Sequence, residues 1–315
     1  MMETAIDPNS RTEHRPDLAE EMRRLLPPQT IIRRKEPLAR RTTLRVGGPA
    51  DIYVEPASIE ELQSVIKFCA EQKLPLFLLG RGSNLLVRDG GFRGVVVCLC
   101  QPHFSRIETA GEHLSCGAGA RLKAVAAEAK RRGLAGLEFL EGIPGSVGGG
   151  LRMNAGAMGG EIFQVVESVR LIDLKGRIEE RAPEDLVVRY RSCQSLKTQI
   201  ALGAVLRGQP ALPSQIAERM NEFSRKRWDS QPAAPSAGCI FKNPLTIPAG
   251  KLVDELGLKG ARVGGAYVSA EHGNFIVNDG TATAQNILEL IELIRGRARA
   301  QRGIELETEV EIVGD

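Results

Sequence analysis

The sequence predicts an α+β fold with more than one domain, organised around a glycine-rich segment near its middle. Three observations lead to this prediction. The chain has 315 residues, a length that favours two or three domains over one. Segments with strand-like and helix-like apolar spacing follow one another from residue 50 onward. The segment 138–161 combines glycines with apolar residues such as Phe139 and Leu151. Flexible linkers are rich in serine instead, so we interpret it as a ligand cradle.

Composition excludes several classes of protein. The net charge of +3 is too small to indicate a nucleic-acid partner. No apolar run approaches the roughly 20 residues that span a membrane, and the N-terminus has no apolar signal core. We therefore expect a cytoplasmic protein without membrane insertion. The basic residues near the start are interpreted as part of a solvated arm: Arg23, Arg24, Arg33, Arg34, Lys35, Arg40 and Arg41.

The cysteines predict neither a metal site nor a disulfide framework. The six are Cys69, Cys98, Cys100, Cys116, Cys193 and Cys239. They form no CxxC pair and no Cys/His cluster with zinc spacing, so we expect no metal and mostly reduced, buried thiols. Cys98 and Cys100 lie two residues apart in an apolar run, which places both on one face of a predicted strand.

The first third of the chain predicts a βαβ unit after a loosely ordered segment, 1–30. A strand over 50–55 precedes a helix that begins at a capping box formed by Ser58 and Glu61. A short buried strand follows at 76–79, then the loop 80–86 and another strand over 94–100. The loop lacks the third glycine of a GxGxxG fingerprint, because Leu85 stands there, and a strand follows it. We therefore reject a Rossmann unit and predict a phosphate-binding loop of another fold.

The remaining elements follow from apolar spacing and turn residues. A small-residue loop at 116–120 opens a helix that ends at Gly133. Segments 165–173 and 177–180 form a predicted hairpin, followed by a strand at 200–205 and a boundary at 210–213. A charged helix through 225–228 begins the second part. The last helix places Ile287, Leu290, Ile291, Ile294 and Ala298 on one face. Segment 304–312 alternates as a strand, with Glu305, Glu307, Glu309 and Glu311 on its polar face.

Seven stretches together resemble the UDP-N-acetylenolpyruvoylglucosamine reductase (MurB) family, from about residue 30 to 314. They are TTLRVGGPA (42–50), GRGSNLL (80–86), GLEFLEGIPGSVGGGLRMNAGAMGGE (136–161), YRSC (190–193), SAGCIFKNP (236–244), HGNFIVN (272–278) and ELETEVEIVG (305–314). The resemblance implies an FAD-binding domain of the vanillyl-alcohol-oxidase (PCMH) type over 31–209, with subdomains at about 31–105 and 106–209. A C-terminal α+β substrate-binding domain would follow over 214–315. The substrate-closing insert of one family type has no counterpart here, which indicates the shorter type.

The resemblance also implies a reaction and a cofactor site. NADPH would reduce non-covalent FAD, which would pass hydride to the enolpyruvyl ether of UDP-N-acetylglucosamine, giving UDP-N-acetylmuramate for peptidoglycan precursors. Unobstructed backbone N–H groups in the two glycine-rich loops would hold the FAD pyrophosphate. The implied cofactor-binding residues are Gly80, Arg81, Gly82, Ser83, Asn84, Leu85, Ile143, Pro144, Gly145, Ser146, Gly148, Gly149, Asn154 and Gly156.

Three catalytic residues follow from the same resemblance. Arg191 in YRSC would grip the substrate carboxylate in two places. Glu309 would stabilise the developing enolate or deliver a proton, although the residues alone leave all four glutamates of its face open. Cys239 stands where the family usually has a proton-donating serine. Implied substrate-binding residues are Tyr190, Arg227, Lys242, Asn243 and Asn274.

Some alternatives remain open at the level of sequence. Arg225 or Lys226 could exchange roles with Arg227, and His272 could be structural. Cys193 also departs from the family serine. We expect Lys242 to lower the pKa of the Cys239 thiol. The chain could instead be another flavin-dependent oxidase or dehydrogenase of the same fold, or a non-catalytic nucleotide-binding protein. For covalent flavin attachment the candidate is Cys116, because His103 and His113 lie outside the glycine-rich loops.

Overall fold

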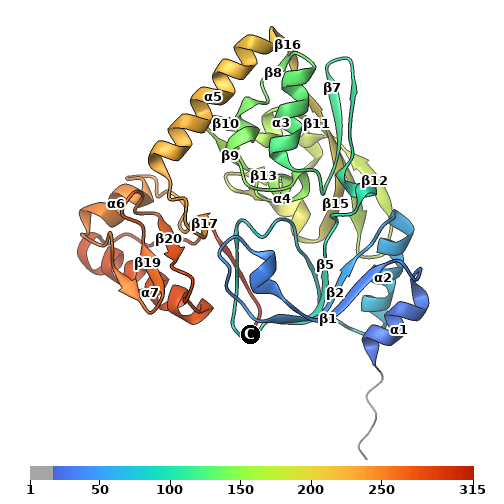
Figure 1. Ribbon diagram of the computed structural model, residues 1–315, viewed down its shortest axis with the longest axis horizontal. Coiled ribbons are helices and arrows are strands. Elements are labelled where there is room, and N and C mark those ends of the chain that lie inside the picture. The colour runs from blue at the N-terminus through green and yellow to red at the C-terminus, as the bar shows by residue number, and fades with distance from the viewer. Residues whose placement is uncertain (1–16) are drawn as a thin grey trace, which may run out of the picture.

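The computed structural model describes residues 17–315, which form three units that meet near the middle of the molecule (Figure 1). The first unit contains a four-stranded sheet in the order β1-β2-β5-β3. Its strands are β1 (Ile31–Pro37), β2 (Pro49–Glu55), β3 (Leu76–Leu78) and β5 (Phe92–Val97). Strands β2, β3 and β5 run parallel, and α2 (Ile59–Glu71) connects β2 to β3. The predicted βαβ unit is therefore confirmed.

The N-terminal segment is more ordered than the sequence predicts. Helix α1 (Leu18–Leu25) begins at Asp17, whose carboxylate accepts the Glu20 N–H, and buries Ala19 and Met22 in the core of the first unit. The prediction of loose order over 1–30 is wrong for this helix, and its part over 1–16 lies outside the described residues. The basic residues do not all point to solvent either, because the guanidinium of Arg41 is partly buried against Glu36 at 2.7 Å.

Two local predictions in this unit need correction. Ser58 caps α2 by accepting the Glu61 N–H, but the Glu61 carboxylate accepts from the Ala57 N–H and Thr30 instead of closing a capping box. Strand β5 ends at Val97, before both cysteines of the predicted strand face. Cys98 is consequently half-buried and Cys100 exposed, whereas the sequence predicts one strand face for both and mostly buried thiols.

The second unit is built on a five-stranded antiparallel sheet in the order β12-β11-β15-β7-β6. The strands are β6 (Ile107–Ala110), β7 (His113–Gly117), β11 (Val166–Asp173), β12 (Ile178–Arg181) and β15 (Gln199–Arg207). Strands β11 and β12 confirm the predicted hairpin. Helices α3 (Leu122–Arg131) and α4 (Val147–Arg152) pack against this sheet, with Gly133 just after α3 at φ +67°.

Helix α5 (Pro213–Ser230) follows the second unit and runs from it toward the third (Figure 1). Its first half buries Ile216 and Met220 in the same hydrophobic core as α3 and α4. The segment between β15 and α5 covers only residues 208–212, so no closing insert separates them. The predicted domain boundary at 210–213 stays a prediction, although the helix after it shares the core of the second unit.

The third unit contains a four-stranded sheet and two helices. Its strands, in the order β17-β20-β19-β18, are β17 (Ser236–Cys239), β18 (Arg262–Val263), β19 (Ala266–Val268) and β20 (Phe275–Asn278). Helix α6 (Ala249–Glu255) and helix α7 (Ala284–Arg302) pack in the same core. The predicted apolar face of α7 is confirmed, because all five of its residues are buried.

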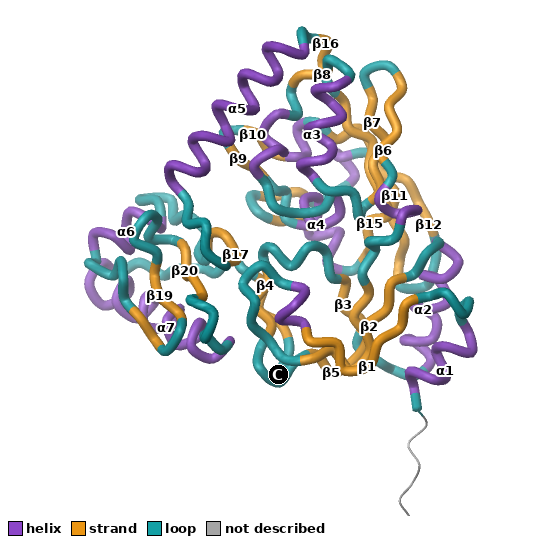
Figure 2. The backbone as a smooth tube through the Cα atoms, in the orientation of Figure 1, coloured by secondary structure: helices purple, strands orange, loops and turns teal. Residues whose placement is uncertain are grey.

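The C-terminal segment returns from the third unit to the first (Figure 2). Only β21 (Glu311–Val313) forms a strand there, and it pairs in parallel with β4 (Leu85–Val87) at the end of the first glycine-rich loop. The predicted strand over 304–312 is therefore too long. The alternation that predicts it is still visible in burial, because Leu306 and Val310 lie in the core of the third unit. The return places residue 309 between the two units.

Short elements complete the described chain. Two-residue strands pair as β8 (Leu134–Ala135) with β16 (Gln209–Pro210), β9 (Gly156–Ala157) with β10 (Gly160–Glu161), and β13 (Val188–Arg189) with β14 (Ser192–Cys193). The 3-10 helices are Leu38–Arg41, Pro102–Ser105, Glu138–Gly142, Ile162–Gln164, Pro183–Asp185 and Gln194–Lys197. Among residues 17–315, no helix is both long and apolar enough to cross a membrane.

Candidate functional site

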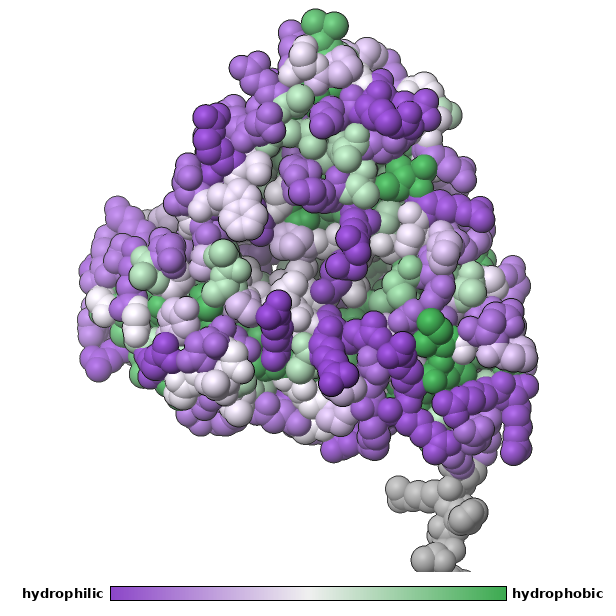
Figure 3. Space-filling view, viewed as in Figure 1, coloured by the Kyte–Doolittle hydropathy of each residue, from purple (hydrophilic) through white to green (hydrophobic). Residues whose placement is uncertain are grey.

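A cavity of about 1130 Å³ lies where the first and second units meet the end of α5. The face of the molecule in Figure 3 is hollowed near its middle. The walls of the cavity come from the ends of β3 and β5, the loop before α3, the start of α4, the start of β15 and the segment 231–236. Several of these segments are loops at strand ends, where backbone groups can be free to bind a ligand. The fold brings them together around one cavity.

Both glycine-rich loops contribute to this cavity, and they contact each other. Gly80, Arg81 and Ser83 line it from the first loop. Pro144, Ser146, Gly148 and Gly149 line it from the second. A Cβ atom on Gly80 would lie 3.2 Å from the Ser146 Oγ atom, so the loops abut. Within residues 17–315, the N–H groups of Gly80 and Arg81 have no protein acceptor. These groups suit an anionic ligand such as a pyrophosphate.

The other seven residues predicted to bind cofactor do not line the cavity. They are Gly82, Asn84, Leu85, Ile143, Gly145, Asn154 and Gly156. Gly82 has φ +63°, and a Cβ there would lie 2.2 Å from the Arg41 carbonyl, so this glycine allows a tight approach of two chain segments. Leu85 is buried in a hydrophobic core. The structure thus assigns several motif residues to support of the loops.

All charged side chains among residues 17–315 that line the cavity are cationic. Its cationic side chains are Arg40, Arg41, Arg45, Arg81, Arg121, Arg152, Arg227 and Lys197, and no described carboxylate lines it. Arg41 and Arg152 are paired with Glu36 and Glu311. The other six have no carboxylate within 4.0 Å in the described chain. Such a wall attracts polyanions and disfavours cationic ligands. The residues that fit FAD are therefore present: free N–H groups for the pyrophosphate and a cationic wall around them.

The sequence does not predict most of these cations as site residues, because they lie far apart in the chain. Arg121 is an exception that a local signal could have revealed. It follows the small-residue loop 116–120 and forms a β-bridge with Ser146 of the second glycine-rich loop. Cys98 and Cys100 also line the cavity, whereas Cys116 is buried elsewhere. The structure therefore gives no support to covalent flavin attachment at Cys116.

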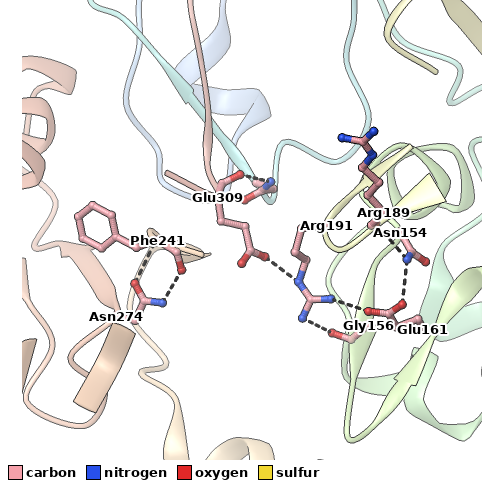
Figure 4. Close-up of polar contacts among 9 residues, drawn as sticks. Asn154, Gly156, Glu161, Arg189, Arg191, Phe241, Asn274 and Glu309 are labelled. Atoms are coloured by element: carbon pink, nitrogen blue, oxygen red, sulfur yellow. Dashed lines mark hydrogen bonds and ion pairs between the residues drawn. The ribbon is translucent and has the colours of Figure 1, made fainter. Parts of the chain in front are cut away.

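Arg191 and Glu309 meet between the second and third units (Figure 4). Arg191 Nε lies 3.1 Å from Glu309 Oε1, and both side chains are largely buried, with 20% and 17% exposed. Arg191 Nη2 also donates to the Gly156 carbonyl at 3.2 Å, and its guanidinium lies 4.8 Å from the centre of the Tyr190 ring. Arg191 has φ +54°, which is rare for a residue with a side chain. A strained residue held by several partners is typical of a functional position.

The second part of the glycine-rich segment supports Arg191. The amide of Asn154 donates to Glu161 at 2.9 Å and to the Arg189 carbonyl at 3.3 Å (Figure 4). Glu161 lies 3.8 Å from the Arg191 guanidinium. Gly156 supplies a carbonyl to Arg191, and a Cβ there would lie 3.1 Å from Arg191 Nη1. Asn154 and Gly156 therefore support Arg191 and its surroundings. The sequence predicts cofactor binding for both residues instead.

Glu309 is fixed through its backbone from both sides. Its N–H donates to the Ile240 carbonyl at 2.8 Å, and its carbonyl accepts from Asn84 Nδ2 at 3.0 Å. Burial raises the pKa of the Glu309 carboxyl, and the positive charges of Arg191 and Lys242 oppose this shift. Of the four glutamates on the predicted strand face, Glu309 contacts Arg191, whereas Glu305 and Glu307 are exposed. The structure thus separates Glu309 from its neighbours, which spacing alone could not do.

Cys239 ends β17, half-buried and within the field of Arg191 and Glu309. Burial raises the pKa of its thiol to about 12, and the charge of Glu309 acts in the same direction. Arg191, a hydrogen bond with Asn274, and Arg227 lower it in part. The Lys242 ammonium pairs with Glu307 at 2.9 Å. The thiol pKa is raised overall and not lowered as the sequence predicts, so the thiol stays protonated at neutral pH.

The five predicted substrate-binding residues differ in their surroundings. Asn274 is buried, and its amide exchanges two hydrogen bonds with the backbone of Phe241, at 2.9 and 2.7 Å (Figure 4). Asn243 is exposed and accepts the Ala249 N–H at the start of α6. Tyr190 is exposed beside Arg191. These contacts give both residues structural roles: Asn274 holds the segment that follows β17, and Asn243 caps the start of α6.

Arg227 is the cation of α5 that faces the cavity. Arg227 is half-buried and lines the cavity, whereas Arg225 and Lys226 are exposed and Lys226 pairs with Glu222 at 2.6 Å. Of the three, Arg227 alone lines the cavity, and its contact with substrate stays a prediction. His272 accepts the Asn274 N–H at 3.1 Å through Nδ1, which is a structural contact. Residues 17–315 contain no group of three or more His, Cys, Asp or Glu side chains that could hold a metal.

Asn84 offers a test of how the first glycine-rich loop is coupled to Glu309. Removing its amide in Asn84→Ala leaves the Glu309 carbonyl without a partner, so Glu309 should shift relative to Arg191. Small displacements of a reacting group are costly, and we expect substrate reduction to slow on the order of tenfold or more. Flavin content and reduction by NADPH should stay near wild-type. Loss of flavin from this variant would instead support the cofactor role predicted from sequence.

The fold and cavity define a flavoprotein: residues 50–181 match the family model of an FAD binding domain. Residues 231–313 match the UDP-N-acetylenolpyruvoylglucosamine reductase C-terminal domain. A UDP-N-acetylenolpyruvoylglucosamine reductase of Syntrophomonas wolfei is 41% identical over 92% of this chain and 97% of its own length. A second relative with this name, from Clostridium novyi, is 45% identical over 87% of this chain and 89% of its length. The crystal structure of the reductase (MurB) from Thermus caldophilus is 38% identical, with a TM-score of 0.79, covering 91% of this chain and 99% of that one.

The chain therefore belongs to the UDP-N-acetylenolpyruvoylglucosamine reductase family. The predicted fold class, a PCMH-type FAD-binding part followed by a C-terminal α+β domain, is confirmed. The chain is of the shorter family type.

Proposed function

We propose that this protein reduces the enolpyruvyl ether of UDP-N-acetylglucosamine with NADPH, forming UDP-N-acetylmuramate for peptidoglycan precursors in the cytoplasm. The observation that carries the proposal is the meeting of Arg191, Glu309 and Cys239 beside a cavity lined by cations and by both glycine-rich loops. A guanidinium, a buried carboxyl and a protonated thiol together can bind a carboxylate and deliver a proton. The names of the relatives agree with this chemistry.

FAD would be held without a covalent bond by the backbone of Gly80, Arg81 and the 146–149 segment. When bound, it supplies the two-electron carrier between NADPH and the enolpyruvyl double bond. The protein's own task is then to bind the substrate, keep it oriented and move one proton.

Arg191 is the group that we assign to the substrate carboxylate. Its guanidinium can bind a carboxylate through two parallel hydrogen bonds, and it already lies in a fixed position. Negative charge develops on the carbon that bears this carboxylate when the double bond is reduced. A preoriented cation lowers the energy of that charge more than it lowers the energy of the neutral group. Glu309 and Gly156 hold the guanidinium in place and so act through Arg191.

Cys239 is the group that we assign to proton delivery. Its thiol carries a proton at neutral pH because burial and Glu309 keep its pKa near 12. The Sγ–H bond breaks as the proton passes to the carbon bearing the carboxylate, which leaves a thiolate. Arg191 and Arg227 are the nearby cations that would stabilise this thiolate until solvent returns a proton.

The two half-reactions test the proposal directly. Under anaerobic conditions, NADPH alone should bleach the yellow absorbance of the bound flavin. Subsequent addition of the enolpyruvyl UDP-sugar should restore the colour and yield UDP-N-acetylmuramate. We expect this alternation because the described residues form one cofactor cavity, so the two nucleotides would take turns at it. A requirement for the UDP-sugar during bleaching, or no product, would refute the scheme. Acid precipitation should release the flavin into the supernatant.

A further inference from the structure

We propose that Trp228, at the end of α5, completes a nucleotide subsite at the mouth of the cofactor cavity, beside Arg227, which the family resemblance already implies for substrate binding. In this subsite the indole ring of Trp228 stacks on a heterocyclic base, and the Arg227 guanidinium binds a phosphate of the same ligand. The inference rests on the proposed function, whose two soluble ligands, a UDP-sugar and NADPH, are both nucleotides. The ligand class is a nucleoside diphosphate derivative other than the resident cofactor.

Trp228 is the only tryptophan of the chain, and it is exposed at an unusual place. It lines the cavity, yet 67% of its surface is exposed to solvent. Leu174, in the turn between β11 and β12, is a second exposed apolar residue that lines the same cavity. Exposed apolar side chains at the edge of a cavity are typical of a binding site, because the ligand removes them from water. An indole adds a flat π surface on which any base can stack.

Arg227 supplies the second half of the subsite. Its side chain is half-buried in the cavity wall, and burial lowers its pKa. No carboxylate of residues 17–315 lies within 4.0 Å of its guanidinium, although Lys226 beside it in the sequence pairs with Glu222. A cation that loses hydration without gaining a partner is unfavourable unless an anion completes the site. Phosphate is the anion that nucleotides offer.

The charge of the whole cavity indicates a ligand in addition to FAD. Six cationic side chains of its wall have no described carboxylate partner, whereas the FAD pyrophosphate carries two negative charges. A second diphosphate would bring the bound negative charge closer to the charge of the wall. The charge of Arg227 lowers the pKa of the Cys239 thiol in part, so this cation acts on both the cavity and the reacting centre.

Helix α5 fixes the position of both residues at the cavity. Arg227 and Trp228 belong to the last turn of an 18-residue helix whose first half is fixed in the second unit. The residues that follow, 231–236, form the cavity wall and lead into β17. The Arg227 stem lies beside Gly142 of the second unit, because a Cβ atom on Gly142 would be 3.7 Å from Arg227 Cδ. The subsite is thus built on a helix and supported by both neighbouring units.

The single tryptophan allows a direct test in the flavin-loaded protein. The indole N–H resonance and the tryptophan fluorescence report Trp228 alone, and Trp228→Phe identifies both signals by their loss. Titration with UDP and, separately, with NADP⁺ should perturb these signals for at least one nucleotide. A response to UDP assigns the subsite to the sugar nucleotide, and a response to NADP⁺ assigns it to the reductant. If both nucleotides perturb the flavin spectrum but neither perturbs Trp228, the proposal is wrong.

Variants test the energetic contribution with matched controls. Trp228→Ala should raise the dissociation constant of the responding nucleotide about tenfold, within the range for loss of one stacking contact. Trp228→Phe should restore most of the affinity. Leu212→Ala, at the exposed start of α5, should have no effect. Arg227→Met should weaken binding and Arg225→Met should not. Loss of flavin from Trp228→Ala would overturn the proposal, because the indole would then hold the cofactor.

These binding measurements do not depend on turnover. If the enolpyruvyl UDP-sugar is not reduced but UDP or NADP⁺ still perturbs Trp228, the proposed function fails and the subsite stands. If the substrate is reduced normally by Trp228→Ala with unchanged KM values for both nucleotides, the subsite fails and the proposed function stands.

Discussion

Replacing Gly80 with valine is expected to give a folded, colourless protein without reductase activity. Gly80 lines the cofactor cavity, and a Cβ atom there would point toward Ser146 Oγ at 3.2 Å. The additional methyl groups of valine would occupy the space between the two glycine-rich loops, where a pyrophosphate would lie. Gly80 does not have a left-handed φ, so the backbone itself tolerates a side chain. The change should therefore affect the ligand more than the fold.

A second glycine of the same motifs serves as the matched control. A Cβ atom on Gly145 would meet Leu122 at 3.5 Å and Ser83 at 3.8 Å, which are ordinary contacts. Gly145 does not line the cavity, so Gly145→Ala should keep its flavin. The measurements are the flavin-to-protein ratio after reconstitution and the circular dichroism of each variant. A Gly80→Val protein with full flavin occupancy would show that the cavity does not hold the cofactor in the proposed way.

The sequence located both glycine-rich loops because their signal is local. Glycines after a predicted strand leave N–H groups unobstructed, and this is visible in a few residues. Which of these groups face the cavity depends on distant partners. Gly82 is turned away because it packs against the Arg41 carbonyl, about 40 residues earlier in the chain. This contact cannot be predicted from residue spacing within the loop. The sequence therefore predicts cofactor binding for the whole loop, including residues that face away from the cavity.

Site residues from single motifs were harder to assign for the same reason. Asn154 and Asn274 belong to specific motifs, yet their amides hold other backbone segments in place. A motif marks residues that a site requires, but it does not separate ligand contact from support. Arg227 could be distinguished from its two neighbours only by the direction in which α5 presents them. Long-range packing sets that direction.

The sequence predicts an element correctly where buried apolar residues recur at a regular spacing. The face of α7 is buried throughout, so its spacing predicts the helix correctly. Segment 304–312 alternates equally well, but a strand also needs a partner to supply hydrogen bonds, and only Glu311–Val313 pairs with β4. Helix α1 was missed although Leu18, Met22 and Leu25 follow helical spacing after the capping Asp17, because it is short and half of its residues are charged. Its stability comes from packing Met22 into the first unit.

Replacing Cys239 with alanine is expected to slow flavin reoxidation by the enolpyruvyl substrate by about 10²-fold or more, the usual scale for a lost general acid. Bleaching of the flavin by NADPH should continue at the wild-type rate, because that step needs no proton from this position. The substitution removes one sulfur atom from a half-buried strand end, so the fold should be retained. Anaerobic stopped-flow absorbance separates the two half-reactions.

The raised pKa of Cys239 also predicts how substrate reduction depends on pH. A proton donor is active while protonated, that is, below its pKa. With a pKa of about 12, the thiol stays protonated throughout the neutral and moderately alkaline range. Loss of this proton should therefore not limit substrate reduction at ordinary alkaline pH. Cys239→Ser should be active with a similar alkaline limb, whereas a thiol acidified by Lys242 would predict a broader limb for the serine variant.

Cys193 provides the control for the thiol chemistry. It is the second position where the chain departs from the family serine, but it is buried in the core of the second unit, away from the cavity wall. Cys193→Ser should keep both half-reactions near wild-type rates. If Cys239→Ala also reoxidises at the wild-type rate, the proton comes from another group. Glu309 is then the next candidate, because burial raises its pKa and favours its protonated form, followed by an ordered water. Loss of that rate in Cys239→Ala with Glu309→Gln would show that Glu309 is required, either as the donor or through its contact with Arg191.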